Sequence, residues 1–174
     1  MITSRLSPAV MDSSELPHAY EEFAATVVRR NSVDPMITEL VRLRCAHYHD
    51  CRLCGSVRLV DAVRSGLDEQ VVSTIDSYET SDFDPRWKAA LRLTDAVIVD
   101  PTGVGPELAA QLREHFTDEQ ISELLFDIVK WSYQKALVSL RLETPLVEGI
   151  GDLVIREDGT LVVTAREGFV TAVA

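Results

Sequence analysis

The chain has 174 residues, 46% of them hydrophobic, which is enough to bury the core of one domain without disulfide cross-links. Its formal charge of −11 argues against a protein that holds nucleic acid or an anionic membrane surface by charge. No apolar run approaches the roughly 20 residues of a membrane-spanning helix, and the N-terminal segment lacks the apolar centre of a signal peptide. We therefore expect a cytoplasmic protein with no nucleic-acid partner and no membrane partner.

The first half of the chain carries the start and stop signals of helices. One helix is expected over Ala19–Arg30. The next should begin at Pro35, because Asp34 can cap the first turn and proline suits the first helical position. Two further helices are expected over Cys51–Ser65 and Asp68–Ser77.

The same signals recur in the next sixty residues. Asp84 and Pro85 repeat the aspartate–proline start, and another helix should begin at Pro106. Thr117 and Gln120 match a capping box, which predicts a further helix directly after the threonine. Apolar residues behind these starts keep a helical period. The pattern predicts an all-α fold, an antiparallel helical bundle.

The last part of the chain has a different character. Two β-rich runs, Leu153–Ile155 and Leu161–Thr164, flank Asp158-Gly159, a dipeptide typical of hairpin turns. An isolated hairpin is marginally stable in water, so it needs a surface to pack on. We expect a helical domain over residues 1–148 and a small C-terminal β-hairpin over 149–174, packed on the bundle or on a neighbouring subunit.

The segment TELVRLRCAHYHDCRLCGSVRLVDAV holds all three cysteines of the chain. A turn after the helix from Pro35 would bring Glu39 back toward Cys51 and Cys54, with Asp50 as the cap of a new helix that starts at Cys51. Helix starts and C-x-x-C spacing both lower a cysteine pKa. Helical geometry also separates the two Cα atoms by about 5 Å, a distance that a disulfide accepts. The pair could therefore cycle between dithiol and disulfide.

Other interpretations of these residues remain open. Two cysteines on one helix can be buried hydrophobic residues, as Cys45 is expected to be. A zinc site is a second possibility, because four candidate ligands stand within eight residues: His47, His49, Cys51 and Cys54. Structural zinc usually takes two separated ligand pairs, which favours the redox interpretation, with no metal and no cofactor.

The spacing Glu39-x11-Cys51-x2-Cys54, followed by WKAALRLTDAVI and FTDEQISELLFDIVKWSYQKAL, resembles the AhpD-like alkylhydroperoxidase branch of the carboxymuconolactone decarboxylase family. The resemblance covers Asp34 to Leu142. It implies a homo-oligomer, often a trimer or hexamer, that reduces hydroperoxides through a redox-active disulfide. It also implies an external dithiol electron donor, such as a lipoyl or thioredoxin-like protein.

The resemblance further implies a role for each residue of the motif. Cys54 would be oxidised to sulfenic acid, and Cys51 would be the proton donor and the resolving thiol. Glu39 would belong to the proton relay. A peroxidase-type thiol-disulfide oxidoreductase is the function that follows.

The chain departs from the family pattern at the relay histidine. The family usually carries histidine four residues after the second cysteine, where this chain has Arg58, and Leu53 replaces a second family histidine. Arginine can hold an anion but releases no proton at working pH. His49 or His47 could act in its place, and Arg58 could instead form a surface ion pair with Asp61. The competing function is a non-catalytic oligomeric scaffold or binding protein that has lost the relay.

Overall fold

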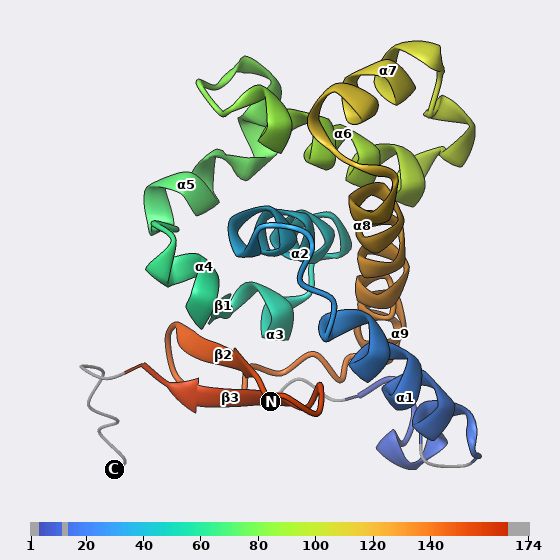
Figure 1. Ribbon diagram of the computed structural model, residues 1–174. Coiled ribbons are helices and arrows are strands. Elements are labelled where there is room, and N and C mark those ends of the chain that lie inside the picture. The colour runs from blue at the N-terminus through green and yellow to red at the C-terminus, as the bar shows by residue number, and fades with distance from the viewer. Residues whose placement is uncertain (1–3, 12–13, 167–174) are drawn as a thin grey trace.

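Helices form most of the computed structural model, which describes residues 4–11 and 14–166 (Figure 1). The α-helices are α1 (Leu16–Val28), α2 (Pro35–His49), α3 (Arg52–Gly55), α4 (Val60–Arg64), α5 (Glu69–Thr74), α6 (Pro85–Val99), α7 (Pro106–His115), α8 (Asp118–Trp131) and α9 (Gln134–Leu140). Short 3-10 helices cover η1 (Pro8–Val10), η2 (Ile75–Thr80) and η3 (Pro101–Gly103). The strands are β1 (Val57–Leu59), β2 (Gly151–Ile155) and β3 (Leu161–Ala165).

The expected helix starts are confirmed at the level of individual hydrogen bonds. The Asp34 side chain accepts from the Met36 N–H at the start of α2, and Asp84 does the same for α6. At the start of α8, Thr117 and Gln120 form both bonds of the capping box. These caps satisfy amide groups that a helix start otherwise leaves without a partner.

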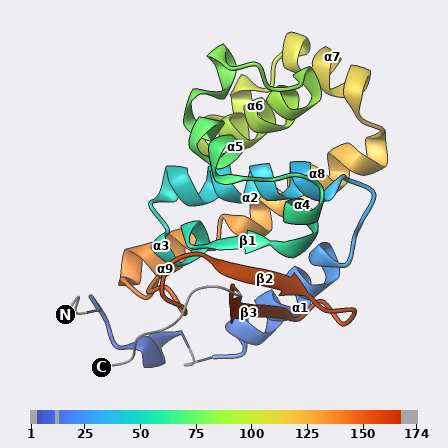
Figure 2. The same ribbon diagram turned by 90° about the vertical axis from the view of Figure 1, so that its left-hand side faces the viewer.

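Helix α2 crosses the middle of the molecule, with α6 on one side and the sheet on the other (Figure 2). Its residues enter two apolar clusters. Ile37 and Val41 join the cluster shared with α6, α7 and α8, whereas Leu40 and Leu43 join the cluster shared with α4 and α5. Because α2 is buried on several faces, its charged residues Glu39 and Arg42 lie inside the protein.

The segment from Cys51 to Ser65 differs from its prediction. It is divided into α3, β1 and α4 instead of forming one helix. β1 pairs in parallel with β2, with Val57 opposite Gly151, and β2 pairs antiparallel with β3. The backbone of Val57–Leu59 therefore bonds to a distant strand, and periodicity within the segment could not reveal that partner. The predicted helix over Asp68–Ser77 is likewise shorter, because η2 takes over from α5 at Ile75.

The C-terminal hairpin is present where the Asp158-Gly159 signal placed it. Gly159 has a φ of 85°, and its turn lies against α1, where Arg29 donates to the Asp158 carbonyl oxygen at 2.8 Å. Because β2 pairs with β1, the hairpin extends a sheet that begins in the helical part of the chain. The domain division at residue 148 stays a prediction, and residues 167–174 of the tail lie outside the described residues.

Within residues 4–11 and 14–166, no helix combines the length and the hydropathy that crossing a membrane requires.

Candidate active site

Glu39 lies in the interior of the protein, with a side chain that is 0% exposed. Its carboxylate accepts hydrogen bonds from Arg42 Nε at 2.6 Å and Arg42 Nη2 at 2.7 Å. The Leu59 N–H, at the end of β1, donates to the same carboxylate at 3.0 Å. A buried carboxylate needs such donors, because an unpaired charge in the core is costly. Glu39 therefore joins α2 to the segment that follows the cysteines.

Arg42 makes the direct connection to the cysteine segment. Its Nη1 donates to the Cys54 carbonyl oxygen at 2.6 Å, and its Nη2 also donates to the Val57 carbonyl oxygen at 2.7 Å. Burial would lower the pKa of Arg42, but the charge and hydrogen bonds of Glu39 outweigh it and raise that pKa. Arg42 was not among the site residues expected from the sequence. Its signal was the spacing of three residues from Glu39, which puts both side chains on one face of α2.

The turn between α2 and α3 does not use Asp50 as expected. Asp50 adopts the left-handed conformation, with a φ of 55°, and ends α2. Cys51 is the residue that caps α3, because its Sγ accepts a hydrogen bond from the Cys54 N–H at 3.3 Å. The prediction of Asp50 as the cap is therefore wrong. Asp50 reverses the chain at the end of α2, so the residue after it, Cys51, becomes the N-cap of α3.

Cys51 and Cys54 lie in contact and have opposite pKa shifts. The hydrogen bond from the Cys54 side chain lowers the pKa of Cys51, and the Cys54 N–H adds to that effect. The same hydrogen bond, together with burial, raises the pKa of Cys54. In the reduced pair the Cys54 S–H therefore donates to the Cys51 sulfur. Burial is the main cause that raises the pKa of Cys45 to about 12, in agreement with its expected place in the core.

The two sulfurs face different surroundings. Cys54 lines a pocket of about 290 Å³, whereas Cys51 is 2% exposed and lines a separate hollow with Asp50 and Ser56. Most of the residues around the Cys54 pocket are apolar or aromatic: Tyr20, Leu53, Val57, Trp131, Tyr133, Leu137, Leu146, Leu153, Leu161 and Val163. Helices α1, α8 and α9 and the hairpin therefore contribute to this pocket, together with α3. A molecule in it would meet Cys54 and not Cys51.

Arg58 lies in β1 and is 4% exposed. Its guanidinium pairs with Glu69 through two hydrogen bonds, at 2.9 and 2.8 Å, and donates to the Gly55 carbonyl oxygen at 2.6 Å. The alternative of a surface pair with Asp61 is wrong, since Asp61 pairs with Arg64. A strand in place of the expected helix removes the three-residue neighbour relation on which that pair depended. Arg58 does not line the Cys54 pocket.

The histidines at the end of α2 do not line the Cys54 pocket, although His47 lines the same hollow as Cys51. Both ring nitrogens of His49 are buried, and burial lowers its pKa, as does the charge of Lys135, whereas Gln134 has the opposite effect. His47 Nδ1 lies 3.2 Å from an Asp76 carboxylate oxygen. Across the described ranges, no three His, Cys, Asp or Glu side chains are grouped to hold a metal ion. The four candidate zinc ligands are therefore not gathered around one point.

Comparison with known proteins shows which family the chain resembles. Residues 14–96, which include the glutamate and the cysteine pair, match the model of the carboxymuconolactone decarboxylase family. The chain is similar to this family over that segment, which is just under half of its length. Its fold is that of the AhpD-like branch, as the resemblance predicted.

The curated relatives match the chain over part of their own length. Rv2313c, an uncharacterized protein of Mycobacterium tuberculosis, is 39% identical over 130 residues, which are 74% of this chain and 46% of the relative. YdfG, an uncharacterized protein of Bacillus subtilis, is 29% identical over 102 residues, 58% of this chain and 69% of YdfG. The chain thus spans about half the length of the first of these relatives.

A solved structure has the same fold. ATU0492 of Agrobacterium tumefaciens, a protein of unknown function named as a candidate antioxidant defence protein AhpD, superposes with a TM-score of 0.69. The match covers 84% of this chain and 100% of that chain, with 24% sequence identity.

Proposed function

We propose that this protein is a thiol-disulfide oxidoreductase of the alkylhydroperoxidase type, which reduces hydroperoxides through Cys51 and Cys54. The observation that carries the proposal is the placement of the pair. Cys54 faces a pocket large enough for a small organic molecule, and Cys51 lies behind it within hydrogen-bond reach.

The reaction begins with a proton transfer between the two sulfurs. The Cys51 thiolate takes the Cys54 proton, which leaves a Cys54 thiolate toward the pocket. That thiolate attacks the terminal peroxide oxygen, so the O–O bond breaks and Cys54 becomes a sulfenic acid. Cys51 then attacks the oxidised sulfur, a disulfide forms and water leaves. One hydroperoxide and two thiols thus give one alcohol, one water and one disulfide.

The pocket lining supports an organic hydroperoxide as substrate. Side chains such as Leu137, Leu153 and Val163 can remove the apolar part of a substrate from water. An external dithiol donor, such as a lipoyl or thioredoxin-like protein, then returns the disulfide to the dithiol.

Glu39 acts in this proposal mainly through Arg42. The arginine bonds the Cys54 carbonyl oxygen and so holds the turn that carries the reactive thiol. Its charge also lowers the pKa of both cysteines, against the larger opposing effects on Cys54. A place for Glu39 in the proton relay, and for His49 or Arg58 in the site, stays a prediction.

A non-catalytic scaffold or binding protein remains the second candidate. The fixed position of Arg58 favours it, because this residue is committed to Glu69 and to a carbonyl oxygen and releases no proton. The expected homo-oligomer, a trimer or hexamer, fits either function. Phe126 and Val129 on α8 are 52% and 53% exposed and could form part of such an interface.

Peroxide turnover with a dithiol donor separates the two candidates. The enzyme should consume an alkyl hydroperoxide, lose two of its three free thiols when no donor is present, and become inactive as Cys54→Ser or Cys51→Ser. Cys45→Ser is the matched control, because Cys45 is buried away from the pair and should leave turnover unchanged. A wild-type protein that keeps three free thiols after hydroperoxide treatment would favour the scaffold.

A further inference from the structure

Lys130 on α8 is a buried lysine with few partners. Its side chain is 1% exposed, and Nζ donates one hydrogen bond, to Asp127 Oδ1 at 2.5 Å. Nζ also lies 4.1 Å from the centroid of the Trp131 ring. An ammonium group has three N–H donors. The rest of the described chain offers Lys130 no second hydrogen-bond acceptor, so the remaining donors are available to a molecule in an adjoining pocket.

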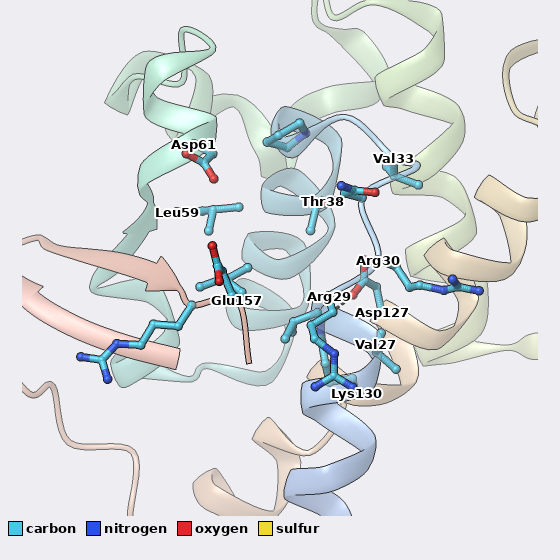
Figure 3. Close-up of a pocket in the computed structure, with 15 residues that line it drawn as sticks. Val27, Arg29, Arg30, Val33, Thr38, Leu59, Asp61, Asp127, Lys130 and Glu157 are labelled. Carbon is cyan, nitrogen blue, oxygen red and sulfur yellow. Dashed lines mark hydrogen bonds and ion pairs between the residues drawn. The ribbon is translucent and has the colours of Figure 1, made fainter. Parts of the chain in front are cut away.

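Lys130 lies in the lining of three pockets, one of which is formed by α1 and the hairpin turn. Another is the 290 Å³ pocket that holds Cys54, and the third is a polar pocket of about 420 Å³ whose lining includes Asp127. Figure 3 shows this polar pocket, with Asp127 and Lys130 on the side where Arg29 and Arg30 also lie and with Glu157 across from them. Lys130 is the residue that the lining of the polar pocket shares with the lining of the Cys54 pocket. It therefore stands between the polar pocket and the reactive thiol.

The proposed reaction needs a proton donor on the Cys54 side. When the O–O bond of an alkyl hydroperoxide breaks, the departing oxygen is an alkoxide, a strong base that leaves slowly unless it is protonated. The Arg58 position holds no residue that can give this proton, and Cys51 lies behind Cys54, outside the pocket lining. The donor must come from another wall of the pocket.

Two other polar groups of the Cys54 pocket, Arg42 and Tyr20, are committed, and Gln134 is not an acid. Arg42, from α2, bonds Glu39 and two carbonyl oxygens and releases no proton. Tyr20, from α1, already donates its hydroxyl to the Lys130 carbonyl oxygen at 2.8 Å, and burial raises its pKa. Tyr133 stacks on Tyr20, and the amide of Gln134 does not ionise. Lys130 is left as the acid with N–H groups to give.

The environment of Lys130 suits proton release. Burial lowers its pKa, and the charge of Arg42 acts in the same direction, whereas Asp127 and Glu123 oppose them. Burial also raises the pKa of Asp127. Both shifts favour the neutral forms of the two side chains more than in an exposed pair. Proton transfer between this pair and the polar pocket therefore costs less free energy.

We propose that Lys130 protonates the departing oxygen when Cys54 attacks the hydroperoxide, in place of the histidine that this chain lacks, and that it regains its proton through Asp127 and the polar pocket. This inference rests on the proposed function. As the S–O bond forms and the O–O bond breaks, sulfur is oxidised, the peroxide is reduced to an alcohol, and one ammonium proton goes to the alcohol oxygen. The neutral amine then recovers a proton from solvent.

The test compares two oxidants in single-turnover mixing with the reduced protein. The leaving group of tert-butyl hydroperoxide is an alkoxide, which needs the proton. The leaving group of peracetic acid is acetate, a stable carboxylate that does not need it. In Lys130→Met, the rate with tert-butyl hydroperoxide should fall about 100-fold, the usual contribution of a general acid, while the rate with peracetic acid stays near that of wild type. An equal loss with both oxidants, or no loss with either, would overturn the proposal.

Additional variants separate a proton donor from a structural charge. Lys130→Arg keeps the charge but releases no proton, so it should be as slow as Lys130→Met with the alkyl hydroperoxide, and a rate restored by arginine would contradict the inference. The pair Asp127→Asn with Lys130→Met leaves no unpaired buried charge and supplies a folded protein if the single variant unfolds. Lys88→Met, on α6 and outside both pocket linings, is the control for loss of a lysine. A wild-type protein inert to both oxidants would overturn the proposed function as well.

Discussion

Arg42 holds both carboxylate oxygens of Glu39, at 2.6 and 2.7 Å, in a part of the core where neither side chain reaches solvent. The same guanidinium bonds the backbone on both sides of the turn that carries Cys54. A rigid bidentate donor of this kind fixes geometry as well as charge. The glutamate of the family motif therefore sets the position of the cysteine turn through a residue outside the motif.

Removal of one member of this pair should destabilise the whole protein. Glu39→Gln leaves the Arg42 charge buried without its partner, and we expect the free energy of unfolding in urea to fall by about 3–5 kcal/mol. Glu22→Gln is the matched control on an exposed site, with an expected change within about 0.5 kcal/mol. If Glu39→Gln unfolds at the wild-type urea concentration, the pair does not hold the cysteine turn.

Arg58, which occupies the position of the family histidine, should stabilise the protein more than an exposed arginine does. Arg58→Met removes the charged donor of the Gly55 carbonyl oxygen and the partner of Glu69, and we expect a loss of about 1.5–3 kcal/mol. Arg64→Met breaks an exposed pair with Asp61 and should cost at most about 1 kcal/mol. Urea unfolding of the two variants measures the difference. Equal effects would indicate that the buried Arg58 bonds stabilise the protein no more than an exposed ion pair does.

The sequence was sufficient for features that depend on neighbouring residues. Helix starts at Asp34, Asp84 and Thr117 each use a cap within three positions, and all are confirmed. The hairpin at Asp158-Gly159 is local in the same sense, since the turn residues select the register. The family motif supplied the two cysteines and Glu39 as candidates.

The sequence was insufficient where a distant residue decides the structure. β1 exists because β2, almost a hundred residues later, pairs with Val57–Leu59. The Cys54 pocket includes Tyr20 from α1 and Leu161 from β3, and neither has a local pattern that points to a thiol. The burial of Lys130 is equally hidden, because a lysine in an amphipathic helix is usually exposed.

The order of the two thiol pKa values gives a direct pH prediction. The Cys54 side chain lowers the pKa of Cys51 below its usual value near 9, so one thiolate should form early in a titration followed by ultraviolet absorbance. Cys54→Ala removes that donor, and the Cys51 step should move to higher pH. Cys45→Ser should leave the step in place, because burial raises the pKa of Cys45 to about 12. A step that Cys54→Ala leaves unchanged would mean that the sulfurs are not hydrogen-bonded.

The turn of the hairpin should control the Cys54 pocket from a distance. Gly159 has a φ of 85°, and a Cβ there would lie 2.5 Å from the Ala25 carbonyl oxygen and 2.7 Å from the Ala25 Cα on α1. Gly159→Ala must therefore accept a left-handed alanine and also move the turn away from α1, which should cost about 2 kcal/mol or more in urea unfolding. Because Leu161 and Val163 follow this turn and line the pocket, KM for an apolar hydroperoxide should rise as well.

Gly105→Ala is the control, since Gly105 has a φ of −78° and open space around it, and it should alter neither quantity. Loss of stability without a change in KM would separate the hairpin turn from the pocket.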